Sequence, residues 1–219
     1  MSKKRAPKRK TNSLKKLLVC VIIVGLIVGG YFIYKSFKPS DETKTPKVVD
    51  EIKSFNYVVN EKDTKLFKKL FGDLKKVLSA KEVDNKKYAE AIAKLFVADF
   101  FSLENKTSKN DVGGVQFVYS TYKTDFIDYA RDGIYKQVKN KLDNNNKQVL
   151  PVVTAVNVSK VEDVDASSIF ESVSFEGDNA AAYEVTVDWE YKNGSGFQDK
   201  AVLTIVHDKD KLSIAQMEE

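Results

Sequence analysis

Eighteen consecutive residues near the start of the chain, Leu17 to Tyr34, contain no charged side chain. Lys16 and Lys35 bound this run, and the sixteen residues before it hold eight Lys or Arg residues and no Asp or Glu. An apolar stretch of roughly 20 residues is long enough to cross the hydrocarbon core of a bilayer as a helix. The sequence therefore predicts a membrane-spanning helix, which constrains where the rest of the chain can lie.

The charges that flank this run predict its orientation. A positive flank stays in the cytoplasm, so we expect residues 1–16 to form a basic cytoplasmic tail held against anionic lipid headgroups. Residues 17–35 then cross the cell membrane once as an uncleaved signal anchor, with the lipid bilayer around Leu17–Tyr34 as the first partner. We expect the domain that follows to lie on the extracytoplasmic side.

Three other interpretations of the run stay open. A cleaved signal peptide is the second choice, since Val28 and Gly30 are small enough for a cleavage site, although the run exceeds the usual 7–15 apolar residues. A buried helix of a soluble protein fits less well, because the run has no polar face. A lipoprotein also fits less well, because Cys20 lies near the start of the run, whereas a lipidated cysteine follows it.

The formal net charge of +5 belongs to the tail. Eight of the 36 Lys and Arg residues lie in residues 1–16, which leaves 28 basic against 31 acidic residues, a charge of −3, for the rest of the chain. Nucleic-acid binding depends on neutralising phosphates, so we expect no nucleic-acid partner. Cys20 is the only cysteine, so the outer domain has no disulfide and no thiol nucleophile, which favours a bacterial envelope over an animal secretory pathway.

The composition of residues 36–50, with two prolines among polar side chains, predicts a linker, and residues 51–219 are predicted to form an extracytoplasmic α+β domain. In the first half of this domain, apolar residues recur with the period of an amphipathic helix. Asp63 or Thr64 is the predicted N-cap of the first periodic stretch, and the second helix is expected to begin near Asp84 or Asn85. We expect helices at about residues 66–78, 85–100 and 121–142.

The second half of the domain is predicted to form strands. Between Tyr183 and Tyr191, apolar side chains alternate strictly with polar ones, as in a strand with one buried face, and Asn193–Gly196 is a turn signal. Helices followed by an antiparallel meander make an α+β fold, with about three helices packed on a curved antiparallel sheet of four to five strands after an N-terminal transmembrane helix. We expect strands at about residues 151–164, 169–175, 183–191, 201–207 and 212–217.

This order of elements resembles the nuclear-transport-factor-like (cystatin-like) cone, over roughly residues 55–217. The resemblance depends on the helices-then-sheet order, on the segment AKLFVADFFSLENKTSKNDVGG (93–114) and on the final hairpin around Asn193–Gly196. It implies about three helices in the hollow of a bent antiparallel sheet. Membrane-anchored proteins of Gram-positive bacteria and scaffold subunits of type IV secretion machines are similar to this arrangement, and the resemblance to the latter implies protein–protein contact without catalysis.

Two features near the end of the second predicted helix are candidate ligand or partner contacts. Asp99 interrupts an apolar run, so its carboxylate is expected to make structural hydrogen bonds or to line the cone interior, where enzymes of the resembled family often place an acid. Gly113 and Gly114 permit close backbone approach in the following loop. The Lys-Ser/Thr ending of a phosphate-binding loop is missing after them.

Aromatic side chains are dense just after this loop, and they either fill a core or line a pocket or a partner surface. Phe117, Tyr119 and Tyr122 are the candidate contacts among them. The whole group is Phe117, Tyr119, Tyr122, Phe126, Tyr129 and Tyr135.

Little in the sequence points to catalysis. His207 is the only histidine, and beside Asp208 it could serve as a general base, although a surface pair flanking a turn is the favoured interpretation. A zinc site needs several His, Cys or carboxylate ligands, and His207 has no partner imidazole or thiol. We expect no enzyme activity, no cofactor and no bound metal.

Two functions remain as hypotheses. The first is a single-pass membrane-anchored extracytoplasmic domain that acts by protein–protein interaction in the bacterial envelope. The alternative is a module that binds a small apolar ligand in the interior of the cone. An enzyme that uses Asp99 or His207 is the weakest reading of these residues.

Overall fold

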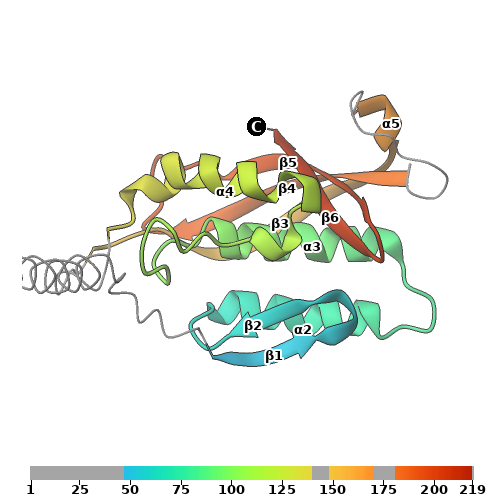
Figure 1. Ribbon diagram of the computed structural model, residues 1–219, viewed down its shortest axis with the longest axis horizontal. Coiled ribbons are helices and arrows are strands. Elements are labelled where there is room, and N and C mark those ends of the chain that lie inside the picture. Colours follow the sequence, from blue (N-terminus) through green and yellow to red (C-terminus); the bar gives the residue numbers. More distant parts are fainter. Residues whose placement is uncertain (1–46, 140–147, 170–180, 219) are drawn as a thin grey trace, which may run out of the picture. The chain divides into compact units, whose positions relative to one another are not determined.

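The main sheet has four antiparallel strands in the order β3-β4-β5-β6 (Figure 1). In the central strand β4, Val185, Val187 and Trp189 are buried, whereas the intervening Asp188 and the following Glu190 are exposed, so one face of the sheet is apolar. The strands are β3 (Val152–Asp165), β4 (Ala181–Lys192), β5 (Lys200–Asp208) and β6 (Lys211–Glu218).

The computed structural model describes residues 47–139, 148–169 and 181–218. Residues 46–219 cluster as one unit by their contacts. Among the described residues, no helix combines the length and the apolar character that crossing a bilayer requires. The predicted membrane segment Leu17–Tyr34 lies outside those residues, as does the predicted end of the third helix near residue 142.

Three helices, α2 (Lys65–Leu78), α3 (Asn85–Phe100) and α4 (Lys123–Asp132), pack with the sheet and confirm the α+β class. The first two start where the sequence predicts. The Thr64 hydroxyl accepts a hydrogen bond from Phe67 N at 3.1 Å, and the Asp84 carboxylate caps α3 by accepting from two backbone N–H groups. Such caps satisfy donors that have no partner within the helix.

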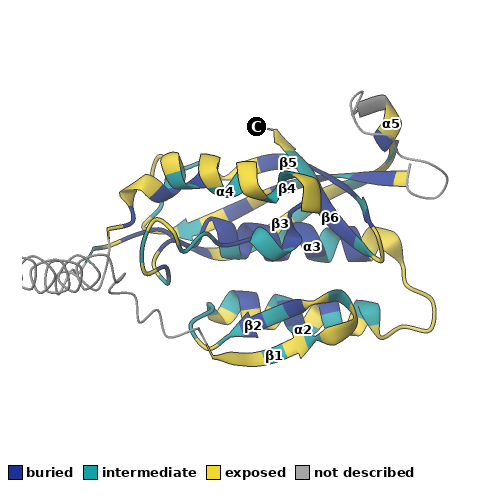
Figure 2. Cartoon of the chain, viewed as in Figure 1, coloured by how far each residue is buried: buried dark blue, intermediate teal, exposed yellow. Residues whose placement is uncertain are grey.

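The core lies between α3 and the apolar face of the sheet, with α2 on the other side of α3. Figure 2 shows α3 as mostly buried, which fits a helix covered on both sides. Burying a large apolar side chain contributes roughly 1.5–3 kcal/mol to stability, so this layer holds the domain together without a disulfide. The largest side chains that are almost fully buried in it include Phe67, Phe71, Phe96, Leu95 and Leu203.

The prediction of one long third helix was wrong. The helix α4 ends at Asp132, and a short 3₁₀ helix, η4 (Ile134–Gln137), follows Gly133. At Gly133 the backbone leaves helical geometry, with φ −94° and ψ −115°, and the next aromatic residue, Tyr135, is fully buried. The apolar spacing continues through this break, so periodicity alone could not reveal it.

A two-stranded sheet precedes the helices, and no strand was predicted there. It consists of β1 (Val48–Ile52) and β2 (Tyr57–Asn60), joined by the 3₁₀ helix η1 (Lys53–Phe55). The start of β1 falls within the predicted linker. The buried Tyr57 hydroxyl ties this sheet to the main one, because it donates a hydrogen bond to Leu212 O at 3.0 Å.

The strand predicted at 169–175 is not seen where the structure can be described. Ile169 ends a short helix, α5 (Ala166–Ile169), and residues 170–180 lie outside the described part of the chain. The other four predicted strands correspond to β3, β4, β5 and β6.

Candidate binding groove

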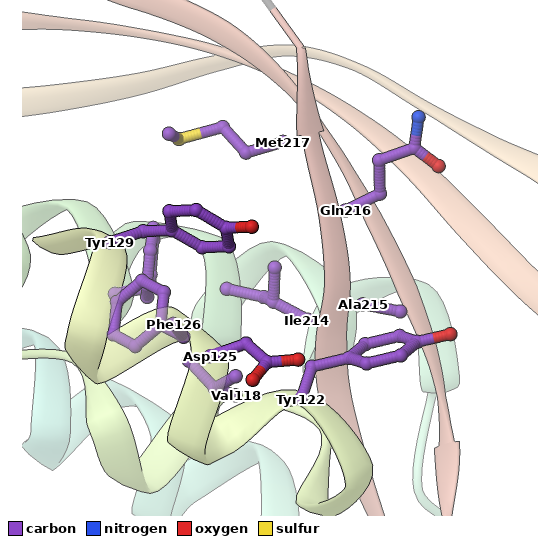
Figure 3. Close-up of a pocket in the computed structure, with 10 residues that line it drawn as sticks. Val118, Tyr122, Asp125, Phe126, Tyr129, Ile214, Ala215, Gln216 and Met217 are labelled. Atoms are coloured by element: carbon purple, nitrogen blue, oxygen red, sulfur yellow. The ribbon is translucent and has the colours of Figure 1, made fainter.

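A groove with a volume of about 430 Å³ lies between α4 and the end of β6 (Figure 3). Pockets that bind small molecules usually have volumes of about 300–1,000 Å³, so the groove is large enough to hold a ligand or a few side chains of a partner. The residues that line it are Phe96, Val118, Tyr122, Asp125, Phe126, Tyr129, Ile214, Ala215, Gln216 and Met217.

The floor of the groove is part of the hydrophobic core. Phe96, Val118 and Ile214 are each at most 4% exposed. The Phe126 ring lies 5.9 Å from the Phe96 ring and 5.1 Å from the Phe100 ring, between centroids, so α4 is packed onto α3 by aromatic contacts. A floor made of packed core side chains is already ordered before anything binds.

The rim of the groove exposes two large apolar side chains. Tyr129 is 81% exposed on α4, and Met217 is 38% exposed on β6. Figure 3 shows them extending over the groove from opposite walls. Single exposed apolar residues are common on protein surfaces, but two that face one apolar groove make a contiguous patch, which marks an interaction site more often than scattered residues do.

One wall of the groove is the edge of the sheet, since β6 is the last strand. Val118 and Tyr119 run parallel to β6 for a single bridge, and Tyr119 N donates a hydrogen bond to Ile214 O at 2.8 Å. The chain then turns into the 3₁₀ helix η3 (Ser120–Tyr122). In the described part of the chain, no strand pairs with this edge beyond Ile214.

A β-bulge lies at the point where the edge becomes open. Ile205 pairs with Ile214 and Thr204 pairs with Gln216, which leaves Ala215 as the extra residue. Bulges bend a strand and are frequent at sheet edges and near functional sites. Here the bulge is followed by Met217, which lines the groove.

Among the described residues that line the groove, Asp125 is the one that carries a charge. It is exposed and lies in the first turn of α4, where the helix dipole stabilises a negative charge. None of the hydrogen bonds and ion pairs found among the described residues involves its carboxylate. Figure 3 shows it directed from α4 toward β6, so the groove combines apolar walls with one negative charge.

Three of the candidate contacts from the sequence lie together elsewhere. Asp99 Oδ1 forms an ion pair with Lys106 Nζ, whose side chain is 3% exposed, and Asp99 Oδ2 accepts a hydrogen bond from Gly114 N at 2.7 Å. Gly113 N donates to the Tyr135 hydroxyl at 2.8 Å, and that hydroxyl donates to Phe100 O at 2.7 Å. We call these residues, Asp99, Lys106, Gly113, Gly114 and Tyr135, the clasp.

The polar groups of the clasp bond to one another and to Phe100 O, all within the domain. A Cβ atom on Gly113 would lie 2.4 Å from Asp99 O, so only glycine fits between the loop and α3. Gly114 has φ +76°, a conformation that glycine adopts without strain. Burial raises the pKa of the Tyr135 hydroxyl well above its usual value, and the negative charge of Asp99 adds to this effect. The clasp holds the loop after α3 against the end of that helix.

The three aromatic candidates have different environments. Phe117 is fully buried, with its ring 5.4 Å from the Tyr57 ring and 6.2 Å from the Phe67 ring. Tyr119 is half-buried and contacts Tyr122 edge to face at 5.5 Å. Of the six candidate contacts, Tyr122 alone lines the groove.

Sequence reasoning missed the residues on the β6 side of the groove. Ile214, Ala215, Gln216 and Met217 were predicted only as a strand, and nothing in a strand pattern tells which edge stays unpaired. On the other wall, Phe126 and Tyr129 belong to the aromatic group noted above. Tyr129, for which the sequence left a core position or a pocket or partner surface open, is exposed.

The residues considered for catalysis are placed as follows. Asp208 is 6% exposed and accepts hydrogen bonds from Ser120 N at 3.0 Å and Ser120 Oγ at 2.9 Å, so its carboxylate anchors η3 and is not on the surface. His207 is half-buried beside it on β5. No group of three or more metal-ligating side chains occurs among the described residues.

Comparisons with protein-family models, with curated proteins and with solved structures found no match for this chain.

Proposed function

We propose that this chain is a membrane-anchored protein of the bacterial envelope, whose extracytoplasmic domain binds another envelope protein through the groove between α4 and β6 and catalyses no reaction. The observation that carries the proposal is the pair of exposed apolar side chains, Tyr129 and Met217, above a floor of packed core residues. Aromatic residues and methionine are enriched at the centres of protein interfaces. A rigid floor reduces the conformational entropy lost when a partner binds.

The location in the proposal is supported by the sequence. The uncharged run Leu17–Tyr34 is long enough to span the membrane, and the basic residues 1–16 favour a cytoplasmic tail that contacts anionic headgroups. The nuclear-transport-factor-like cone is proposed as the fold family, supported by the order of the helices and the antiparallel sheet.

The groove supports a protein partner over a small apolar ligand in the interior of the cone. The space between α3 and the sheet is occupied by side chains such as Phe96 and Leu203, which are at most 1% exposed. The groove, in contrast, borders the open edge of β6. An open sheet edge offers backbone groups that another polypeptide can pair with.

Photo-cross-linking in intact cells tests the proposal with the full chain in its membrane. A photoreactive phenylalanine analogue replaces Tyr129, and the control carries the same analogue at Val83, which is 39% exposed and lies outside the groove. We expect a protein partner cross-linked from position 129 and not from position 83. The partner is then identified by mass spectrometry and purified.

Direct binding of the purified partner completes the test. We expect Met217→Glu, in the full chain in lipid nanodiscs, to weaken binding at least tenfold, because it places a charge on the apolar rim. Val49→Glu is the matched control, since Val49 is 51% exposed on β1 and does not line the groove. Equal cross-linking from both positions, or equal binding by both variants, contradicts the proposal. A lipid that co-purifies with the domain, in place of a protein partner, supports the small-ligand alternative.

The membrane anchor has its own test. We expect the full chain to remain with the membrane fraction, and protease added to intact cells stripped of their wall to digest the domain while leaving the tail protected. Release of the domain into the medium contradicts the uncleaved anchor.

A further inference from the structure

The open edge of β6 begins where an internal strand-like contact ends. Val118 and Tyr119 occupy this edge at Ile214 through one parallel bridge and the hydrogen bond from Tyr119 N to Ile214 O. The chain then leaves the edge as η3. The next residues of β6, through Glu218, pair with β5 on one side only among the described residues. Among the described residues, the position of a fifth strand beside β6 is therefore occupied at Ile214 and open beyond it.

The groove lies beside the open part of this edge. Ala215, Gln216 and Met217 line it from β6, and Asp125, Phe126 and Tyr129 line it from α4. A strand placed on the edge would direct alternate side chains to one face of the sheet, and a side chain on the α4 side would enter the groove. Strand addition uses main-chain hydrogen bonds for affinity and pockets for alternate side chains for specificity.

The charge in the groove selects the kind of segment that fits. Asp125 has no described partner, and Glu218 at the end of the edge is also exposed. A cationic side chain would give Asp125 a charge-assisted hydrogen bond. A second copy of this chain fits poorly, because pairing two β6 edges brings the Asp125 and Glu218 carboxylates of both copies to the same short edge.

We propose that the partner binds as an extended segment that adds a fifth strand to the outer edge of β6, with a large apolar side chain in the groove and a Lys or Arg beside Asp125. This inference rests on the proposed function, and it names the chemistry of the partner's binding segment. The apolar side chain contacts Phe126 and Ile214, which line the groove. Met217 and Tyr129 flank it from the two walls of the groove.

Selection from a displayed library of random ten-residue peptides tests the inference with the full chain in nanodiscs. Peptides that also bind Met217→Glu are removed by counter-selection. We expect the selected peptides to share apolar residues at alternate positions and at least one Lys or Arg. Helical spacing of the apolar residues, acidic consensus peptides or the absence of any selected peptide overturns the inference.

Backbone methylation distinguishes strand addition from binding by side chains alone. In the best peptide, one amide nitrogen at a time is methylated, which removes a hydrogen-bond donor. We expect the affinity to fall at least tenfold at every second residue and to change little at the residues between, since neighbouring amides of a strand point in opposite directions. Affinity that does not alternate in this way overturns the inference.

A charge exchange tests the role of Asp125. We expect Asp125→Lys to lower the affinity for the basic peptide at least tenfold. The same variant should bind a peptide in which the Lys is replaced by Glu more tightly than the unmodified chain does. Asp132→Lys is the matched control, because Asp132 is exposed on the same helix but does not line the groove. Equal effects of the two variants overturn the inference.

Competition with the cross-linked partner separates the two proposals. If the partner still cross-links from position 129 but the peptide does not displace it, the strand inference fails and the proposed function stands. If no partner cross-links from that position, the proposed function itself fails. Displacement of the partner by the peptide, and not by its alternately methylated form, supports both.

Discussion

Asp99 and Asp125 each precede a phenylalanine, Phe100 and Phe126, whose rings contact each other, but the surroundings of the two carboxylates differ. Asp99, in the clasp, has a side chain that is 15% exposed and pairs with Lys106 and Gly114 N. Asp125, in the groove, is exposed and has no partner among the described residues. A carboxylate whose partners are all internal holds the fold together, whereas one left without a partner beside an apolar surface is available to bind another molecule.

The physical difference is in desolvation. Burying a charge costs several kcal/mol unless a partner and hydrogen bonds compensate, and the clasp supplies these to Asp99. Asp125 keeps its hydration until something enters the groove. Changes in the clasp should therefore affect folding, and changes in the groove should affect binding.

The largest effect is expected from Lys106→Ala in the clasp. Removing one partner of a buried ion pair leaves the other charge uncompensated, which costs about 3–5 kcal/mol. Urea unfolding of fragment 46–219 measures the change. The double variant Asp99→Asn with Lys106→Met should regain much of the loss, because no buried charge then remains. A loss below about 1 kcal/mol for the single variant, within the range of exposed ion pairs, would show that the clasp is not structural.

A smaller effect is expected from Gly114→Ala. Its positive φ is unfavourable for alanine, and the new Cβ would lie 2.8 Å from a ring atom of Phe96, so we expect a loss of about 1–3 kcal/mol. Gly196→Ala is the matched control, because Gly196 has φ +83° and nothing within 4 Å of the new Cβ. The difference in unfolding free energy between the two variants measures the contact with Phe96, and equal losses would mean that this contact relaxes freely.

Alkaline pH should destabilise the domain through its buried tyrosines. Burial raises the pKa of Tyr135, and burial also raises the pKa values of Tyr57 and Tyr88. A raised pKa in the folded state gives stability that is present below the unfolded pKa of about 10 and is lost as the pH rises above it. Each such tyrosine contributes a slope of up to about 1.4 kcal/mol per pH unit.

Tyr135→Phe isolates one of these groups. It leaves Gly113 N without its acceptor, which costs about 1–3 kcal/mol at neutral pH. It also removes one titrating hydroxyl, so the free energy of unfolding should fall less steeply between pH 10 and pH 12 than in the unmodified domain. Tyr129→Phe, at an exposed position, is the matched control. An unchanged slope in Tyr135→Phe would contradict the assignment.

The smallest effect on stability is expected from Tyr129→Ala in the groove. The side chain is 81% exposed, and substitutions at exposed positions usually change the free energy of unfolding by no more than about 0.5 kcal/mol. Thermal or urea unfolding checks this, alongside the binding assay in which the same variant should lose the partner. A loss of more than about 2 kcal/mol in the free energy of unfolding would show that Tyr129 stabilises the fold, as the clasp residues do, and would contradict a role in binding alone.

The sequence predicted best where the signals are local. The starts of α2 and α3 were predicted, the first with its cap at Asp63 or Thr64, because Thr64 and Asp84 bond to backbone groups within three residues. The third helix was predicted too long, since its end depends on Tyr135 entering the core and bonding to Gly113 and Phe100, far away in the chain. The hairpin of β1 and β2 was missed because Tyr57 makes its deciding contacts with Tyr88 and Leu212.

By itself, the sequence determined the α+β class, the order of most elements and the uncharged segment Leu17–Tyr34, because periodicity, capping and hydrophobic length are properties of neighbouring residues. Only the tertiary structure decided which aspartate is enclosed and which faces the groove. It also decided that β6 is the last strand of the described sheet and that Tyr129 and Met217 lie on opposite walls of one groove. These features depend on which distant segments meet, and that is set by the packing of the whole domain.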